Sequence, residues 1–342
     1  MENFIVSARK YRPASFDTVV GQLAITSTLR NAIVNHQLAQ AYLFTGPRGV
    51  GKTTCARIFA KTINCLNLQP NAEPCNECES CKAFNAGRSL NIHELDAASN
   101  NSVDDIRGLV EQVRILPQVG KYSVYIIDEV HMLSKSAFNA LLKTLEEPPA
   151  HVKFIFATTE IRKVPVTVLS RCQRFDLQRL SIEDLLKLFN KIIAAEDLKA
   201  DNEALHMIAV AAGSARDGLS LLDQAISLGG GKVRIDIVKE MLGMADRGQT
   251  FELFNQMVGG DMQALLGKLQ EMYRNGATPA AVIGDLINLT HALTKALLLP
   301  GFVNDASLSE NDRNFLKETS GKLSIATLSK IWQMLIKGMN EM

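Results

Sequence analysis

The chain has 342 residues, 46% of them hydrophobic, which is enough for about two or three domains with substantial cores. Lysine plus arginine (37) nearly balance aspartate plus glutamate (36), which excludes a protein coated in positive charge and requires any nucleic-acid contact to be local. No apolar run approaches the roughly 18 residues of a membrane span, and the first residues lack the layout of a signal peptide. We therefore expect a cytoplasmic protein with no membrane partner.

An N-terminal arm precedes the first predicted strand. Residues 8–13 read ARKYRP and include Tyr11 and Arg12, and Val19 and Val20 follow. Such an arm is either a plain surface extension or, because it precedes a phosphate-binding motif, a wall for an adenine base. We predict the second role for these four residues.

Residues 46–53 read GPRGVGKT and match the P-loop pattern G-x-x-x-x-G-K-T. An apolar strand (41–45) precedes them and a helical pattern (54–64) follows, which is the context that the motif requires. The glycines bring backbone N–H groups close to a polyphosphate, and the helix directs its positive end at the same anion. A loop that only turns the chain is the weaker alternative. The predicted nucleotide contacts are Gly46, Arg48, Gly49, Val50, Gly51, Lys52, Thr53 and Thr54.

Two side chains of this motif have separate roles. Lys52 is expected to neutralise charge on the β- and γ-phosphates, and the hydroxyl of Thr53 to ligate Mg²⁺.

Four cysteines follow the P-loop helix with the spacing C-x9-C-x2-C-x2-C: Cys65, Cys75, Cys78 and Cys81. In a reducing cytoplasm, clustered cysteines indicate a metal rather than disulfides. Gaps of two residues let thiolates converge on one tetrahedral ion, and four thiolates are typical of structural zinc with no open coordination position. An iron–sulfur cluster and unliganded thiols are the alternatives. Cys55 and Cys172 stand apart and are predicted to be core or structural residues.

A strand at residues 91–95 leads to a helix at 103–113, whose start resembles a capping box made by Ser102 and Asp105. The N-terminus of a helix that follows a loop is also able to bind a DNA phosphate. Asn101 and Ser102 are therefore candidate DNA contacts, although simple capping explains the same residues.

Residues 123–127 form an apolar run typical of a strand buried on both faces of a parallel sheet. Asp128 and Glu129 follow at its C-terminal end, where such sheets bind ligands. Asp128 is expected to hold Mg²⁺, and Glu129 to orient and deprotonate an attacking water. An acidic strand end alone is weak support, but together with the P-loop it predicts hydrolysis of a nucleoside triphosphate.

Further strands are predicted at residues 153–159 and 173–177, so five strand candidates alternate with helices. This order predicts an α/β fold with a parallel, doubly wound sheet. From about residue 181 the strands stop, and helical patterns extend to about 243, with a glycine turn at 229–231. A second helical block begins near residue 249.

The chain resembles the AAA+ clamp-loader ATPases of the bacterial DNA polymerase III holoenzyme. Besides the P-loop and the cysteines, the matching segments are residues 8–13 (ARKYRP), 128–131 (DEVH), 142–149 (LKTLEEPP), 170–172 (SRC) and 213–217 (GSARD). The resemblance implies an AAA+ nucleotide-binding domain at residues 1–180 with a zinc module at about 65–81. It also implies a helical lid at 181–243 and an all-α collar for oligomerisation at 244–342.

The resemblance also implies roles for three further residues. Thr159 matches the sensor position near the γ-phosphate or the attacking water. Arg171 matches an arginine finger that reaches the nucleotide of a neighbouring subunit, and Arg216 matches a second sensor on the lid. A surface ion pair is the ordinary alternative for both arginines. The implied catalytic residues are Lys52, Asp128, Glu129, Thr159, Arg171 and Arg216.

The implied function is an ATPase motor that places the sliding clamp (beta) on primer-template DNA, as a component of DNA-directed DNA polymerase III. The implied cofactors are ATP, Mg²⁺ and Zn²⁺, and the implied partners are the delta and delta-prime subunits, further copies of this chain, the clamp and DNA. Two alternatives remain. A non-hydrolysing structural subunit is disfavoured by the intact P-loop, and another AAA+ DNA motor, such as a branch-migration helicase, by the cysteines and the Ser-Arg-Cys segment.

Overall fold

The computed structural model describes residues 6–242, 247–299, 301–304, 308 and 310–341. The chain divides into two compact units, Met1–Ile235 and Asp236–Met342. The predicted domain boundary between residues 243 and 244 lies outside the described residues and stays a prediction.

The first unit is built on a five-stranded parallel sheet with the strand order β2-β3-β4-β1-β5. Its strands are β1 (Ala41–Thr45), β2 (Ile92–Asp96), β3 (Ser123–Asp128), β4 (Val152–Thr158) and β5 (Gln173–Asp176). The central strands are buried almost throughout, as expected for a parallel sheet covered on both faces. The register pairs Asp96 with Asp128 and Thr45 with Thr158, so the carboxyl ends of these strands meet at one edge. The predicted parallel α/β sheet is confirmed.

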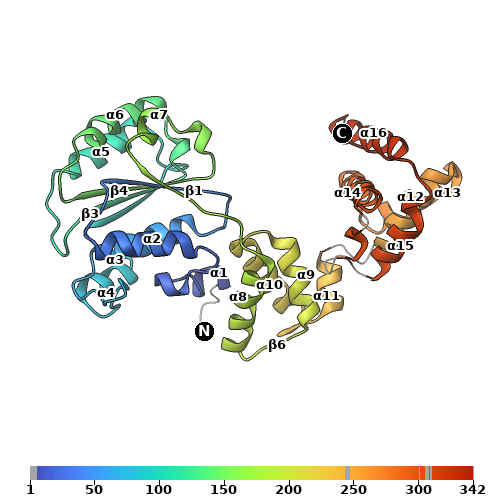
Figure 1. Cartoon of the computed structure of the whole chain (residues 1–342), viewed down its shortest axis with the longest axis horizontal. Helices are drawn as coiled ribbons and strands as arrows, with labels where there is room; N and C mark the ends of the chain where they lie inside the picture. Colours follow the sequence, from blue (N-terminus) through green and yellow to red (C-terminus); the bar gives the residue numbers. More distant parts are fainter. Residues whose placement is uncertain (1–5, 243–246, 300, 305–307, 309, 342) are drawn as a thin grey trace. The chain divides into compact units, whose positions relative to one another are not determined.

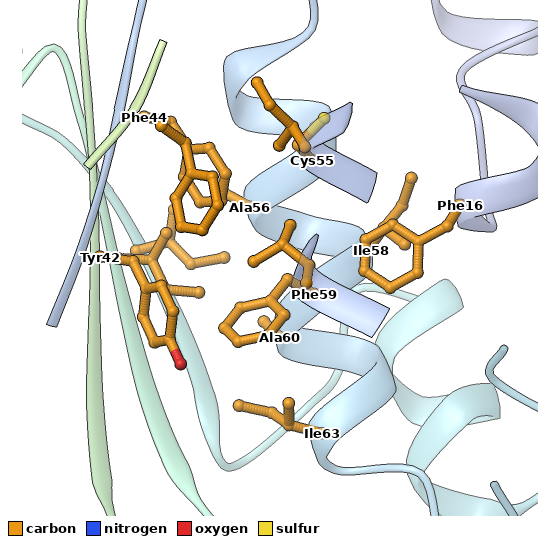
Figure 2. Close-up of a cluster of buried hydrophobic side chains, with 14 of the residues drawn as sticks. Phe16, Tyr42, Phe44, Cys55, Ala56, Ile58, Phe59, Ala60 and Ile63 are labelled. Atoms are coloured by element: carbon orange, nitrogen blue, oxygen red, sulfur yellow. The ribbon is translucent and has the colours of Figure 1, made fainter. Parts of the chain in front are cut away.

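Helices cover both faces of this sheet (Figure 1). One face carries α2 (Leu23–Val34), α3 (Lys52–Ile63) and α4 (Glu79–Asn85). The other face carries α5 (Val103–Gln112), α6 (Lys135–Glu146) and α7 (Val166–Leu169). Successive residues of a strand point to opposite faces, and β1 accordingly sends Tyr42 and Phe44 into the cluster with α3 but Ala41 and Leu43 into the cluster with α6. Figure 2 shows Tyr42, Phe44 and Phe59 of α3 within the first cluster.

The remaining part of the first unit is helical. It contains α1 (Ser7–Lys10), α8 (Ile182–Ala195), α9 (Asn202–Ala212) and α10 (Ala215–Leu228). Gly213 takes a left-handed conformation (φ 63°) between α9 and α10, and the Ser214 hydroxyl caps α10 by accepting from Asp217 N at 3.2 Å. The expectation that strands stop after residue 181 is wrong at one short parallel pair, β6 (Lys199–Ala200) with β7 (Lys232–Val233). Two residues are too few to produce a readable alternation pattern.

The second unit is helical in the part that the structure describes, and α11 (Ile235–Met241) crosses the boundary between the units. Its other helices are α12 (Arg247–Gly259), α13 (Met262–Arg274), α14 (Pro279–Leu298), α15 (Glu310–Ser320) and α16 (Ile325–Glu341). The core of this unit gathers around α14, which buries Val282, Leu286 and Leu293 at helical spacing.

By length and composition alone, α14 passes a test for membrane-spanning helices, a test that buried core helices also pass. Asp285, His291 and Lys295 interrupt its apolar residues, in agreement with the expectation that no apolar run reaches the length of a membrane span. Since its inward face forms the core of the second unit, a core helix accounts for the same composition.

Candidate functional site

A cavity of about 670 Å³ lies in the first unit at the carboxyl edge of the sheet. Its size is typical of sites for small molecules and cofactors. Most of the residues predicted to bind or react with a nucleotide line it: Tyr11, Arg12, Val19, Val20, Arg48, Gly49, Val50, Gly51, Lys52, Thr53, Thr54, Asp128, Glu129, Thr159 and Arg216. These residues are up to 205 positions apart in the sequence (216 − 11), and the fold brings them to one place.

The P-loop conformation depends on its glycines. Gly49 and Gly51 have φ angles of 79° and 104°, which disfavour any residue with a Cβ atom. A Cβ on Gly49 would also lie 2.4 Å from the Ser214 hydroxyl. Because α3 begins at Lys52, the N–H groups of its first turn lack helical partners and are available to an anion in the cavity.

Gly46 is the one predicted P-loop contact that does not line the cavity. A Cβ at this position would lie 2.4 Å from the carbonyl oxygen of Leu177, so glycine is required for the chain to pass the end of β5. Its own carbonyl accepts a hydrogen bond from Lys52 at 2.9 Å.

Lys52 is buried, with 5% of its surface exposed, and its ammonium group also donates to the Pro47 carbonyl at 2.9 Å. Burial lowers the pKa of Lys52, while the carboxylates of Glu129 and Asp128 oppose that change. The ammonium group therefore lies inside the loop, in position to exchange backbone carbonyls for phosphate oxygens.

Thr53 and Asp128 form a pair of oxygen ligands. The Thr53 hydroxyl donates to an Asp128 carboxylate oxygen at 2.6 Å, which joins the start of α3 to the end of β3. Hydroxyl and carboxylate oxygens are the ligands that Mg²⁺ prefers. The donor set thus fits a magnesium ion bound together with a polyphosphate.

Glu129 is oriented by the end of the neighbouring strand. It has a left-handed backbone (φ 47°), and its carboxylate accepts hydrogen bonds from the Thr159 backbone N–H at 3.1 Å and hydroxyl at 2.9 Å. His131 lies beside it, 3.4 Å from the same carboxylate oxygen, and contacts the Thr158 hydroxyl at 2.9 Å. The predicted base and the predicted sensor are therefore in direct contact.

The helical part of the first unit and the arm close the cavity from the other side. Arg216 lines it, and its backbone N–H reaches the Gly49 carbonyl at 3.4 Å. Tyr11 donates its hydroxyl to Glu196, a hydrogen bond that raises the pKa of Tyr11. Burial lowers the pKa of Arg12, and the nearby positive charge of Arg57 acts in the same direction.

Arg171 does not line the cavity. It follows α7, its side chain is 33% exposed, and its guanidinium donates to Glu146 at 2.7 Å and to the Thr167 carbonyl at 2.7 Å. Within the chain it is thus bound in a surface ion pair, away from the residues that surround Lys52.

The four clustered cysteines converge. All their sulfur atoms lie within 4.8 Å of one another, which is compatible with one ion held tetrahedrally by four thiolates. Backbone N–H groups donate to the sulfurs: Cys75 N to Cys65 Sγ at 3.3 Å, and Cys78 N to Cys75 Sγ at 3.3 Å. Such donors stabilise the negative charge of a thiolate.

The other two cysteines are separate from this cluster. Cys55 is fully buried in the core, as predicted, and Cys172 is half-buried. Burial raises the pKa of both thiols to about 12.

Several residues of the cavity were not predicted from the sequence. Asp96 is the last residue of β2, and Ala98, His131 and Met132 follow strand ends; that position was the available signal. Leu180, Leu188, Ala215 and Leu219 reach the cavity from the helical part, and nothing in their local pattern identifies them.

The two candidate DNA contacts have other structural roles. In the predicted capping box the hydroxyl of Ser102 accepts from the Asp105 backbone N–H at 3.2 Å, and the carbonyl of Asn101 accepts from Ser134 N at 3.3 Å. Asp104 and Asp105 lie in the first turn of α5, where their charges disfavour a phosphate. A DNA contact here stays a prediction.

Three family profiles together match most of the chain. They are described as "DNA polymerase III, delta subunit" at residues 21–181, "DNA polymerase III clamp loader subunit, ATPase lid domain" at 185–231, and "DNA polymerase III subunits gamma and tau domain III" at 233–342.

Curated relatives match nearly the whole chain. The Bacillus subtilis DNA polymerase III subunit tau is 43% identical over 98% of this chain and 59% of its own length. The Escherichia coli subunit tau is 39% identical over 99% of the chain and 53% of its own length, so the chain spans about half the length of such relatives. The subunit gamma of Buchnera aphidicola from Baizongia pistaciae is 34% identical, and the chain covers 92% of it.

Solved structures support the fold. The Thermotoga maritima RuvB Holliday junction branch migration motor superposes with a TM-score of 0.52 at 20% identity, covering 81% of this chain and 85% of that chain. At this identity the likeness concerns the fold alone, and the predicted AAA+ α/β architecture is confirmed.

Proposed function

The chain belongs to the family of DNA polymerase III gamma and tau subunits, and we propose that it is an ATPase motor subunit of the replicative clamp loader. The observation that carries the proposal is the single cavity that unites Lys52, the Thr53–Asp128 pair, the Glu129–Thr159 pair and Arg216. In this proposal ATP binding and hydrolysis drive the loading of a sliding clamp onto primed DNA.

Nucleotide binding relies on the groups described above. The P-loop N–H groups and Lys52 neutralise the polyphosphate, while Thr53 and Asp128 would hold Mg²⁺, which when bound offsets charge on the β- and γ-phosphates. The arm residues Tyr11, Val19 and Val20 provide the surface for the base. Arg216 brings a cation from the helical lid to the same phosphates.

Hydrolysis requires a base at the γ-phosphate. We assign this role to Glu129, whose carboxylate would accept the proton of the attacking water. Thr159 holds that carboxylate through two hydrogen bonds, so it is positioned both to orient the base and to sense the γ-phosphate. The proton passes from water to Glu129 while the oxygen of that water attacks the γ-phosphorus, the bond from this phosphorus to the β–γ bridging oxygen breaks, and ADP leaves.

The transition state needs a further positive charge. Arg171 does not supply it to the cavity of its own chain, because it does not line that cavity. In our proposal Arg171 leaves Glu146 and approaches the nucleotide of a neighbouring subunit in an oligomeric ring or arc. The isolated chain is therefore expected to hydrolyse ATP slowly. The neighbours proposed are the delta and delta-prime subunits and further copies of this chain.

The four cysteines are proposed to hold a structural zinc ion, since four thiolates leave no coordination position for a substrate. An iron–sulfur cluster is the alternative, and metal analysis with an absorption spectrum separates the two. The proposed compartment is the cytoplasm, where thiols remain reduced.

Two other functions are less well supported. A non-hydrolysing structural subunit would not need Lys52, Thr53, Asp128 and Glu129 together in one cavity. The chain shares its fold with RuvB, a branch-migration motor. The cysteine cluster and the match to the gamma and tau profile nevertheless favour a clamp-loader subunit.

The decisive experiment is ATP turnover by the chain assembled with its partner subunits, measured with and without clamp and primed DNA. We expect strong stimulation when both are present. Turnover that is unaffected by clamp and DNA would contradict the proposal, and stimulation by branched DNA alone would favour the second alternative.

A further inference from the structure

The N-terminal arm forms one wall of the cavity. Six of its residues line it: Ala8, Tyr11, Arg12, Pro13, Val19 and Val20. The arm has little regular structure of its own, since only α1 and a single turn at Phe16–Thr18 are helical. Its conformation must therefore be set by the groups that hold it.

Glu73, from the loop between Cys65 and Cys75, holds the arm in its second half. It is 4% exposed, and its carboxylate accepts hydrogen bonds from the backbone N–H groups of Phe16 at 3.0 Å and Asp17 at 2.9 Å. A buried carboxylate that accepts two N–H groups is a strong anchor. Arg30 of α2 forms an ion pair with Glu73, which offsets the cost of burying its charge.

A second contact connects the cluster region to the same part of the arm. The ammonium group of Lys61 in α3 is almost fully buried and donates to the Ala14 carbonyl at 3.2 Å and to Asn85 of α4 at 2.9 Å. The arm is thus held on both sides of Ser15, immediately between its lining residues Pro13 and Val19.

Glu73 lies in a loop whose two ends belong to the cysteine cluster. The loop that carries it begins at Cys65 and ends at Cys75, and the sulfurs of these two residues are 3.5 Å apart. Inside the loop, Gln69 N donates to the Glu73 carbonyl at 3.1 Å, and Ala72 belongs to the same buried cluster as Phe16. An ion bound by the cysteines would close this loop through its bonds to Cys65 and Cys75, which would reduce the conformational freedom of the loop.

We propose that the cysteine cluster sets the nucleotide affinity of the cavity, and that Glu73 is the positioning residue that transmits this effect to the arm. The proposal rests on the nucleotide site proposed above. It assigns to the metal module a regulatory role, in which loss of the ion releases Glu73, loosens the arm and weakens nucleotide binding. Because coupling between two sites is reciprocal, bound nucleotide must also retain the ion more tightly.

The first test compares Glu73→Gln with Glu77→Gln in the full chain. Glu77 belongs to the same module but is exposed, so it is a matched control. In Glu73→Gln an amide N–H₂ replaces one accepting oxygen, while the four thiolates remain. We expect Mg-ADP to bind about fivefold to tenfold more weakly, with metal content per chain unchanged. Affinity equal to that of Glu77→Gln would overturn the proposal.

The second test uses the unaltered chain, so it does not depend on folding of a variant. The rate at which a chelator removes the ion is measured with and without saturating Mg-ADP, and we expect about a fivefold slower release with nucleotide. If Mg-ADP leaves the rate of ion removal unchanged, the proposal is overturned. This outcome holds even if the Glu73→Gln variant has lost its metal, because the unaltered chain is measured. If the unaltered chain does not bind Mg-ADP at all, the proposed function fails as well, and the two failures are thereby distinguished.

Discussion

The cavity and the surface around Arg171 belong to the same unit but are built in opposite ways. The cavity gathers its cations and carboxylates under cover, with Lys52 only 5% exposed. Arg171 is 33% exposed and bonded to Glu146 at the surface. A buried site binds its ligand without help, whereas an exposed cation becomes effective only when another molecule desolvates it. In the proposed function, this difference means that nucleotide binding is built into the chain and that hydrolysis awaits assembly.

The sharpest test of this contrast is Arg171→Ala. In the assembled complex we expect turnover at the neighbouring nucleotide to fall about a thousandfold, because a charge that stabilises the transition state is lost. Binding of ATP by the variant chain itself should be unchanged. Arg174→Ala is the control, since Arg174 is also exposed and paired, with Asp176. Mixed complexes in which only the variant's own nucleotide is affected would show that Arg171 acts within its own chain.

Glu129→Gln tests the proposed base within the cavity. Turnover should fall about a hundredfold or more because the amide cannot accept the proton of the attacking water, while ATP affinity should stay within about twofold of the original. Stimulated turnover and equilibrium binding of ATP measure the two effects. Near-normal turnover would remove Glu129 from its role as base. Glu147→Gln, which alters an exposed carboxylate that does not line the cavity, is the control.

A smaller effect is expected for Arg216→Ala. Loss of one charge-assisted hydrogen bond to the phosphates should weaken ATP binding about tenfold. Arg216→Lys should retain part of the affinity, because it keeps the charge but not the planar guanidinium. Titration with ATP by calorimetry gives both values, and unaltered binding in the alanine variant would place Arg216 outside the phosphate site.

The smallest effect on chemistry is expected for Cys78→Ser, because Cys78 does not line the cavity and loss of the ion reaches the nucleotide only through the arm, where it weakens binding. It should release the bound ion and lower the melting temperature by about 4–8 °C, since a metal that closes a loop contributes to folding. Elemental analysis and thermal unfolding measure these outcomes, with Cys172→Ser as the control for metal content. Unchanged metal content would mean that the ligands are wrongly assigned.

Local motifs were predicted well from the sequence because their chemistry depends on short, fixed spacings. The P-loop turn, the acidic pair after β3 and the Ser102–Asp105 capping box all appear where the residue pattern placed them. Strand β1 coincides with the predicted residues 41–45, since a short, fully buried run next to a glycine loop allows little choice. Short helices such as α4 and α7 were not predicted, because one or two turns carry too little periodicity.

The sequence by itself determined the class of fold, the phosphate-binding loop and a cysteine set with metal-ligand spacing. Only the tertiary structure decided which distant groups share one cavity, and it decided this through the parallel register. That register aligns the ends of β3 and β4, so that Glu129 meets Thr159 across 30 residues of chain. It was also the fold that separated Arg171 from the cavity and joined Glu73 to the arm, because packing distances between elements depend on the whole core rather than on any local spacing.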